Sequence, residues 1–387
     1  MPILILLGAL TVAIWMWLLF AHGRFWQVGV NRAPSDLPPG PQATVAAVIP
    51  ARNEADVIVP VVRALLAQRD FAMPVYLVDD GSTDGTADAA RSAAATLDEK
   101  GRLMVLSGQS LPDGWTGKLW AVHQGIERAM QSDPEWLLLA DADVEQGKDT
   151  VARLTAIASD CGYDLVSFMV KLHCKSFAEK LLIPAFVFFF FKLYPPAWIR
   201  DPRHSTAGAA GGCILVRSSA LAKAGGIAAI RSALIDDCAL AALIKRNGGK
   251  VWLGLTKQSR SLRPYDHFRD VERMIARTAF HQLHHSVLLL LGTVIGMSML
   301  YLAPVLLLLS GVWQAVLLGV AAWLLMTIAY ASMVRFYRLH MLWALTLPLA
   351  ALCYEVATLH SAIRYWGGAG GSWKGRHQDF EKARTNS

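Results

Sequence analysis

The sequence predicts a mostly parallel α/β domain held at a membrane by apolar helices at both ends of the chain. Three observations support this prediction. Hydrophobic residues make up 54% and charged residues 17% of the 387 residues, and the mean hydropathy is +0.36, which is too apolar for an ordinary soluble protein. Long uncharged runs lie near both ends. Between them, short apolar segments alternate with polar, alanine-rich segments of helical length.

The first apolar run, Ile3 to Phe20, is uncharged and long enough to span the hydrocarbon core of a bilayer. Trp15 and Trp17 lie near its end, where interfacial aromatic residues are expected. A cleavable signal peptide is the alternative, but no Lys or Arg precedes the run and no small-x-small cleavage site follows it. Arg24 and Arg32 follow the run instead, so the positive-inside rule predicts that the next domain is cytoplasmic.

Three further apolar runs lie near the C-terminus, at about Val287–Leu309, Val312–Met333 and Met341–Leu359. No charge separates the first two, whereas basic residues separate the second from the third. The positive-inside rule then predicts that the loop between the first and second runs is external and that the loop between the second and third runs is cytoplasmic. A third full span would place the basic tail outside the cell. The alternative is a re-entrant third run broken by Pro348.

Between the membrane runs, Leu181 to Phe191 is apolar but too short to span, and it contains Pro184. We interpret it as an interfacial segment at about 178–199, with a buried helix of the soluble domain as the alternative. The expected organisation is an N-terminal anchor at 1–22, a proline-rich linker at 23–43, the α/β domain at 44–285, a membrane region of two or three helices at 286–363 and a basic cytoplasmic tail at 364–387.

The net charge of +7 does not indicate nucleic-acid binding, because no nucleic-acid motif is present and the aromatic residues fall mostly in apolar runs. Basic residues beside membrane runs suit anionic lipid headgroups, and basic residues in a cleft suit a phosphorylated substrate. The five cysteines show no C-x-x-C spacing, so reduced structural thiols in a cytosolic domain are expected.

The middle of the chain alternates strands and helices, which predicts parallel strands with right-handed crossovers and ligands beyond the carboxyl ends of the strands. The expected strands are Val45–Ile49, Val75–Val78, Leu103–Leu106, Trp136–Ala140, Leu165–Val170 and the short Cys213–Val216; the expected helices are Glu54–Gln68, Asp84–Ala95, Lys118–Met130 and Lys148–Ala158.

Two carboxylates, Asp141 and Asp143, follow the expected strand Trp136–Ala140. They repel each other unless a cation lies between them, and Mg²⁺ or Mn²⁺ prefers carboxylate and phosphate oxygens. A metal-bound diphosphate is therefore the expected occupant. The alternative is a solvated loop with two acidic residues.

Other polar residues follow neighbouring strands. Asp79 and Asp80 lie at the mouth of the sheet, where a carboxylate can accept from a base or a ribose hydroxyl; a capped strand-to-helix turn is the alternative. Lys118, which begins a helix after Gly114 and Gly117, can reach a phosphate.

A second group of candidate residues lies later in the chain. Gly211 and Gly212 belong to a glycine cluster that would let a substrate approach the backbone, or that provides flexibility alone. Asp236 and Asp237 begin a helix, where capping explains one carboxylate and a general base would explain the other. The basic run ending at Arg277 suits either lipid headgroups or a phosphate clamp.

In this order and spacing, the motifs resemble those of glycosyltransferase family 2, whose catalytic domain has the GT-A fold. The resemblance covers about Val45 to Arg277. The motifs that carry it are Pro50-Ala-Arg-Asn-Glu54, Val78-Asp-Asp-Gly-Ser-Thr-Asp84, Gly117-Lys118, Asp141-Ala-Asp143, Gly211-Gly212 and Asp236-Asp237. The membrane segments, Ser261-Leu-Arg-Pro-Tyr265 and Trp373-Lys-Gly-Arg376 look most similar to bacterial hopanoid-associated (hopene-associated) glycosyltransferases, and are also similar to ceramide glucosyltransferases.

The resemblance implies a role for each matching residue. It places the nucleoside, expected to be uridine, against Pro50, Ala51, Arg52, Glu54, Asp79 and Asp80. It places Lys118 near the diphosphate, and Asp141 and Asp143 on the ribose, the diphosphate and the Mg²⁺ or Mn²⁺. Asp237 matches the catalytic base, preceded by Asp236 where the family usually has Glu, and Gly211 and Gly212 would face the acceptor. Arg277 is a candidate diphosphate ligand, although Arg273-Met-Ile-Ala-Arg277 lacks the spacing and the Trp of the family's motif, which argues against processive synthesis.

The expected function is that of an inverting glycosyltransferase in the bacterial cytoplasmic membrane. It would transfer a sugar from a nucleotide-sugar, expected to be a UDP-sugar, to a lipid acceptor related to hopanoids at the cytoplasmic leaflet. Two alternatives stay open: transfer to a polyprenyl phosphate, and an inactive membrane scaffold of the same fold. A transporter is disfavoured because the apolar runs carry little charge beyond Glu355.

Overall fold

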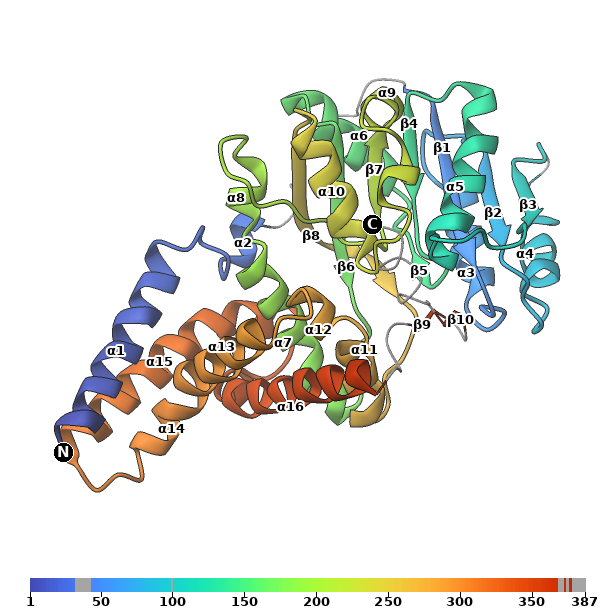
Figure 1. Cartoon of the computed structure of the whole chain (residues 1–387). Coiled ribbons are helices and arrows are strands. Elements are labelled where there is room, and N and C mark those ends of the chain that lie inside the picture. Colours follow the sequence, from blue (N-terminus) through green and yellow to red (C-terminus); the bar gives the residue numbers. More distant parts are fainter. Residues whose placement is uncertain (32–42, 99, 368–371, 374–375, 378–387) are drawn as a thin grey trace. The chain divides into compact units, whose positions relative to one another are not determined.

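The computed structural model describes residues 1–31, 43–98, 100–367, 372–373 and 376–377. Most of the expected linker, Lys374 and Gly375 of the Trp373–Arg376 motif, and most of the basic tail therefore lie outside the described residues. The chain forms two compact units (Figure 1). The sheet unit comprises Arg32–Leu172, Trp198–Arg263 and Ser372–Ser387, and the helical unit comprises Met1–Asn31, His173–Ala197 and Pro264–Gly371.

The sheet unit is built on an eight-stranded mixed sheet with the order β3-β2-β1-β4-β7-β6-β8-β5. The strands β1 to β4 are parallel, β7 is antiparallel to both of its neighbours, β8 is parallel to β6, and β5 is antiparallel to β8. The strand bounds are β1 Val45–Ala51, β2 Val75–Asp79, β3 Leu103–Ser107, β4 Trp136–Leu139, β5 Val144–Glu145, β6 Leu165–Lys171, β7 Ile214–Arg217 and β8 Val251–Ser261.

Helices cover both faces of this sheet. The odd-numbered residues of β1 pack into one apolar cluster with residues of three helices: α3 (Ile58–Leu66), α4 (Thr86–Ala94) and α6 (Thr150–Cys161). The opposite face of β1 meets α5 (Gly117–Ala129), where Gly125 permits close approach, because a Cβ there would lie 2.4 Å from Cγ1 of Val48. Burial on both faces explains why the parallel strands are continuous apolar runs.

The described part of the sheet unit also contains two further helices. They are α9 Ser218–Lys223 and α10 Asp236–Arg246, with the 3-10 turns η1 Met130–Ser132 and η2 Ile227–Ile230. A short helix, α8 (Pro196–Arg200), lies at a boundary between the units, and β9 (Ser372–Trp373) pairs with β10 (Arg376–His377) in an antiparallel ribbon. Helix α3 begins later than the predicted Glu54, because Glu54 closes a turn by accepting from the main-chain N–H groups of Val57 and Ile58.

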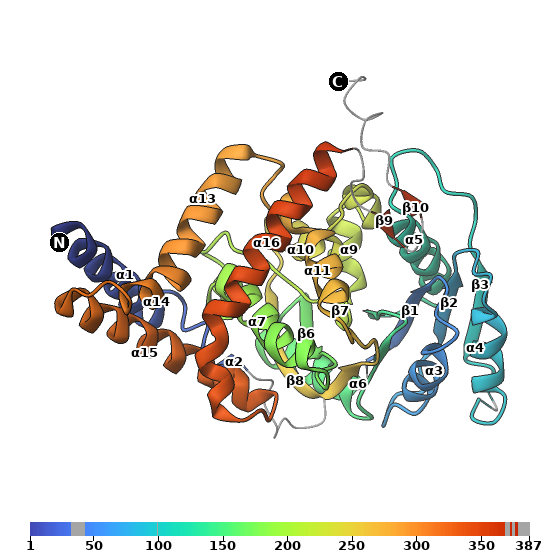
Figure 2. The same ribbon diagram turned by 90° about the horizontal axis from the view of Figure 1, so that it is seen from below.

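The helical unit contains four helices that are long and apolar enough to cross a membrane, at Pro2–Phe20, Val287–Leu307, Trp313–Phe336 and Met341–Trp366. The first is α1. The second combines α13 (Val287–Met297), the π-helical η3 (Ser298–Leu302) and α14 (Ala303–Leu307); the third is α15, and the fourth combines η4 (Met341–Thr346) with α16 (Leu347–Trp366). Figure 2 shows α1, α14 and α15 side by side. The short helices of this unit are α2 Val28–Asn31, α11 Phe268–Ala276 and α12 Ala279–Gln282.

Two prolines of this unit lie within continuous helices. Pro348 lies in the first turn of α16, where a helix needs no N–H from that residue, so it does not interrupt the helix. Pro184 lies inside α7 (Phe177–Leu193), whose Phe188 and Phe189 are buried against Tyr330 and Tyr354 of the same unit. The position of α7 at a membrane interface and the spanning or re-entrant course of the last apolar run stay predictions.

Candidate active site

The ends of β1 and β2 bring the predicted nucleoside-binding residues together. Ala51 and Asp79 are paired in the strand register, and the N–H of Asp80 donates to the carbonyl of Ala51 at 2.8 Å. Asp80 is buried, and the guanidinium of Arg52 donates to its main-chain carbonyl and lies 3.6 Å from its carboxylate. Pro50 precedes Ala51 in β1 and lines the pocket described below.

Asp79 serves the local turn. Its Oδ1 accepts from the main-chain N–H of Ser82 at 3.1 Å and from the Ser82 hydroxyl. Gly81 between them has a φ of +66°, a conformation that disfavours residues with a side chain. Oδ1 of Asp79 therefore stabilises the strand-to-helix turn, as the alternative predicted. A nucleoside contact by Asp79 would use its other carboxylate oxygen.

Lys118 occupies the centre of the charged cluster. Thr116 caps α5, accepting from the N–H of Leu119 at 3.3 Å, and the following turn directs Lys118 along the sheet edge. Its Nζ lies 2.8 Å from Oδ1 of Asp141 and 3.0 Å from Oδ2 of Asp236. Burial alone would lower the pKa of Lys118, but the two carboxylates raise it by a larger amount. The net shift of the pKa is upward, so the amine stays charged.

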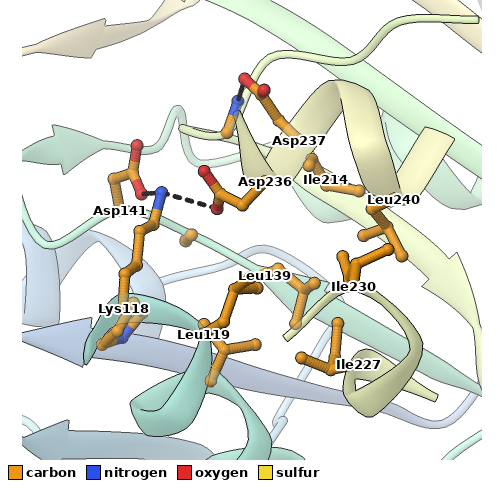
Figure 3. Close-up of a pocket in the computed structure, with 14 residues that line it drawn as sticks. Lys118, Leu119, Leu139, Asp141, Ile214, Ile227, Ile230, Asp236, Asp237 and Leu240 are labelled. Carbon is orange, nitrogen blue, oxygen red and sulfur yellow. Dashed lines mark hydrogen bonds and ion pairs between the residues drawn. The ribbon is translucent and has the colours of Figure 1, made fainter. Parts of the chain in front are cut away.

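The carboxylate of Asp237 is held by main-chain donors, one of which is drawn in Figure 3. Its Oδ2 accepts from the N–H of Gly211 at 2.9 Å and its Oδ1 from the N–H of Cys238 at 2.7 Å. Burial and the neighbouring Asp236 raise the pKa of Asp237 to about 6, although Lys118 and the two hydrogen bonds oppose the shift. A carboxylate with this pKa can accept a proton near neutral pH.

The two predicted acceptor-facing glycines have different surroundings. A Cβ on Gly211 would lie 3.4 Å from Nζ of Lys118 and 3.5 Å from carboxylate oxygens of both Asp141 and Asp237, so this glycine borders the charged cluster directly. A Cβ on Gly212 would instead lie 2.9 Å from Cγ2 of Val144. The absence of a side chain at Gly212 is therefore explained by packing against β5.

The D-x-D spacing predicts one cation shared by Asp141 and Asp143. In the structure the two carboxylates have different partners. Asp141 pairs with Lys118, whereas Asp143 accepts from Nε of Arg263 at 2.8 Å. The Nη2 of Arg263 also donates to both carboxylate oxygens of Glu54, at 2.8 and 2.6 Å. Sequence reasoning grouped Arg263 with a basic run beside the membrane and missed this role. The sequence carried no signal for this contact, because it depends on the pairing of β8 with β5 directly after Asp143.

A pocket lies between α5, η2 and α10 at this sheet edge (Figure 3). Its polar residues are Lys118, Asp141, Asp236 and Asp237, and Gly211 contributes backbone. The rest of the lining is apolar: Pro50, Leu119, Val122, Leu139, Ala140, Ile214, Ile227, Ile230 and Leu240. Arg277 follows α11 in the helical unit and is not among the residues that the sheet unit assembles.

The carboxylates suit a divalent cation held jointly with a ligand. Among the described residues, no group of three or more His, Cys, Asp and Glu side chains is arranged to hold a metal by itself. Mg²⁺, however, is commonly bound through one or two carboxylates together with substrate phosphates. Asp141 and Asp143, which are 31% and 19% exposed, supply oxygens of that kind. The fit is to a cation that arrives with a diphosphate.

Residues 46–225 match the family model described as Glycosyl transferase family 2. This family 2 segment contains Asp79, Asp80, Lys118, Asp141 and Asp143, and it ends before Asp236 and Asp237. An N-acetylglucosaminyltransferase of Rhizobium leguminosarum bv. viciae is 28% identical over 135 residues, covering 34% of this chain and 29% of that protein. The chain thus matches less than a third of this relative's length.

One solved structure has a fold similar to that of this chain over more than the matched segment. The mannosyltransferase PcManGT from Pyrobaculum calidifontis, solved with GDP-Man and Mn²⁺, is 17% identical with a TM-score of 0.55, covering 92% of this chain and 99% of its own. Glucosyl-3-phosphoglycerate synthase from Mycobacterium tuberculosis, in complex with Mn²⁺, UDP-Glc and phosphoglyceric acid, is 16% identical with a TM-score of 0.39, covering 60% and 78%. The first likeness, together with the sheet topology, confirms the predicted GT-A type of fold.

Proposed function

We propose that the protein is an inverting glycosyltransferase that transfers a sugar from a UDP-sugar to the hydroxyl group of a lipid at the cytoplasmic leaflet. One observation carries the proposal. Lys118, Asp141 and Asp237 meet at a single pocket of a family 2 fold, in a chain that also has four helices of membrane-spanning length and composition. A hopanoid-related lipid is the acceptor class that the sequence resemblance suggests.

The donor half of the site is argued from charge. Lys118, which keeps its proton, supplies a cation for the diphosphate once its carboxylate partners engage the donor. Asp141 and Asp143 would hold the divalent cation, which when bound would neutralise charge on the leaving diphosphate. Asp79, Asp80 and the end of β1 lie beside this site and would contact the nucleoside.

The acceptor half of the site depends on Asp237. The N–H groups of Gly211 and Cys238 hold its carboxylate in one orientation, and its pKa of about 6 leaves it ionised at neutral pH yet basic enough to take a hydroxyl proton. The hydroxyl oxygen would then attack the anomeric carbon opposite the leaving diphosphate. A single in-line displacement of this kind inverts the anomeric configuration.

The lining of the pocket favours a neutral alcohol over a phosphate as the attacking group. Three carboxylates and one lysine face the pocket, and Asp236 and Asp237 adjoin the acceptor side. A phosphate monoester would be repelled there, whereas a hydroxyl can donate to Asp237. The remaining walls are aliphatic and would leave the hydroxyls of a sugar acceptor without partners. This observation ranks a lipid alcohol above a polyprenyl phosphate.

The membrane assignment is argued from the helical unit. Four helices satisfy the length and composition of membrane spans, and many of their large apolar side chains are exposed, for example Leu288, Leu306 and Leu324. Exposed aliphatic residues on helices of this length suit a lipid environment. With Arg24 directly after the first span, the positive-inside rule puts the sheet unit in the cytoplasm of a bacterial cell, at the inner membrane.

The decisive experiment incubates the purified full chain with Mn²⁺, bacterial lipid extract and radiolabelled sugar nucleotides, supplied one at a time. We expect labelled lipid with one UDP-sugar and none after EDTA treatment. Label only from a GDP-sugar would correct the donor assignment, and a product that releases its sugar in mild acid would identify a phosphate acceptor. Folded protein that labels no lipid with any donor would contradict the proposal.

A further inference from the structure

Arg263 holds together two carboxylates that the donor site needs. Its guanidinium bridges Asp143 and Glu54 through three hydrogen bonds of 2.6 to 2.8 Å. The Arg263 side chain is 32% exposed, whereas Asp143 and Glu54 are 19% and 10% exposed. A fork that engages two carboxylates at these distances is a strong, charge-assisted arrangement.

The surrounding backbone fixes this arrangement. The strands β5 and β8 pair Val144 with Ser261, and the N–H of Leu262 donates to the carbonyl of Asp143 at 2.8 Å. Arg263 is therefore delivered next to Asp143 by the register of the sheet. On the other side, the N–H of Glu54 donates to Oγ1 of Thr86 at 2.8 Å, which fixes the second carboxylate.

We propose that Arg263 is a built-in competitor for the divalent cation: it occupies Asp143 in the resting site and withdraws onto Glu54 when a metal-bound diphosphate enters. A positive guanidinium and a divalent cation cannot both lie against one carboxylate without strong repulsion. Glu54 gives the guanidinium a partner that it keeps after it leaves Asp143. Lys118 has the corresponding relation to Asp141 and Asp236.

The arrangement has a consequence for selectivity. A cation that arrives alone must displace Arg263 without compensation, whereas one that arrives with a diphosphate brings anionic oxygens that the displaced guanidinium can face. The resting site should therefore bind free Mn²⁺ weakly and bind it more tightly with a nucleotide diphosphate. The inference rests on the proposed function only in requiring that the site accept a metal-bound diphosphate.

The test measures Mn²⁺ binding directly, from the electron paramagnetic resonance signal of the free ion, with purified full-length protein and no donor or acceptor. Removing the competing charge in Arg263→Gln should tighten Mn²⁺ binding about tenfold. Arg263→Lys, which keeps the charge but can engage only one carboxylate at a time, should give an intermediate affinity. Adding UDP should tighten Mn²⁺ binding in the wild type more than in Arg263→Gln.

Arg260→Gln is the matched control. It removes the same charge three residues earlier in the chain, but Arg260 pairs with Glu145 and is 64% exposed, so the Mn²⁺ affinity should stay within about twofold of the wild type. Unchanged or weaker Mn²⁺ binding by both Arg263→Gln and Arg263→Lys, in protein that melts as the wild type does, would overturn the proposal. That result would not contradict the proposed function, provided that the wild type still transferred sugar. Tighter Mn²⁺ binding without any transfer would support Arg263 as the competitor and contradict the proposed function.

Discussion

Replacing Asp237 by Asn tests the proposed base with little change in shape. The amide keeps an acceptor oxygen for one of the two main-chain N–H groups, those of Gly211 and Cys238, but cannot take a proton from a hydroxyl. General-base catalysis typically contributes about 10²- to 10⁴-fold, so we expect kcat to fall by that factor. Binding of UDP, measured by calorimetry, should be unchanged because the donor contacts are on other residues.

The pH dependence has a definite sign. The pKa of Asp237 is raised to about 6, mainly by burial and by Asp236, so the basic form is lost as the pH falls through about 6. Wild-type kcat/KM should therefore fall about tenfold per pH unit below that value. The residual activity of Asp237→Asn should lack this limb.

The same shift predicts an effect on stability that needs no substrate. A carboxyl group whose pKa is higher in the folded chain than its ordinary 3.8 stabilises the fold fully below pH 3.8, and this contribution disappears as the pH rises through about 6. The whole shift corresponds to about 3 kcal/mol, of which about half is lost between pH 5 and pH 8. The wild type should lose about 3–6 °C of Tm relative to Asp237→Asn over this interval.

The assay is thermal unfolding in detergent, followed by tryptophan fluorescence, at both pH values. Asp88→Asn, on the exposed surface of α4, controls for the substitution itself and should retain wild-type turnover. A kcat of Asp237→Asn within about threefold of the wild type would remove Asp237 as the base. A Tm difference that is equal at the two pH values would show that burial does not raise the pKa of this carboxyl.

Three further predictions address the rest of the site. Lys118→Gln should weaken UDP binding by about 10- to 100-fold in calorimetry, the loss expected for charged hydrogen bonds, and unchanged affinity would exclude a diphosphate role. Gly211→Ala has an unstrained φ and should keep its Tm, but its methyl group beside Lys118 should reduce kcat by about 10- to 100-fold; full activity would place the substrate elsewhere. Exposed Cys161 should react with a membrane-impermeant maleimide in inside-out vesicles and not in spheroplasts, with Cys161→Ser as the control; the reverse pattern would invert the topology.

The parallel half of the sheet could be predicted from the sequence because its strands are buried on both faces. Val45–Ala51 and Trp136–Leu139 are continuous apolar runs, which only burial on both faces explains, and each is followed by polar residues. The strand β8 was missed for the opposite reason. Its second half, Lys257 to Ser261, alternates exposed polar and buried residues, and Gly254 interrupts its apolar half. A mixed pattern of this kind does not distinguish a strand from a loop.

The site residues divide in the same way. Lys118, Asp141, Asp236 and Asp237 could be placed at one pocket because each follows a predicted strand or begins a predicted helix at the same sheet edge. Spacing in the sequence could not reveal that Asp237 is held by the N–H of Gly211, since that contact depends on the course of the segment directly before β7. The predicted strands and helices indicate which side chains lie at the same edge of the sheet, whereas the hydrogen-bond partners of those side chains depend on tertiary packing.

Arg263 shows most clearly what the linear pattern hides. In the sequence it belongs with basic residues beside an apolar region, and a headgroup contact is a reasonable interpretation. In the fold it is the partner of Glu54 and Asp143, which precede it by more than a hundred residues. The D-x-D spacing suggested two carboxylates in need of one cation, but the protein supplies a separate cation to each of them. We therefore expect metal binding at this site to be an exchange of cations, with a strength that depends on how readily Arg263 and Lys118 give way.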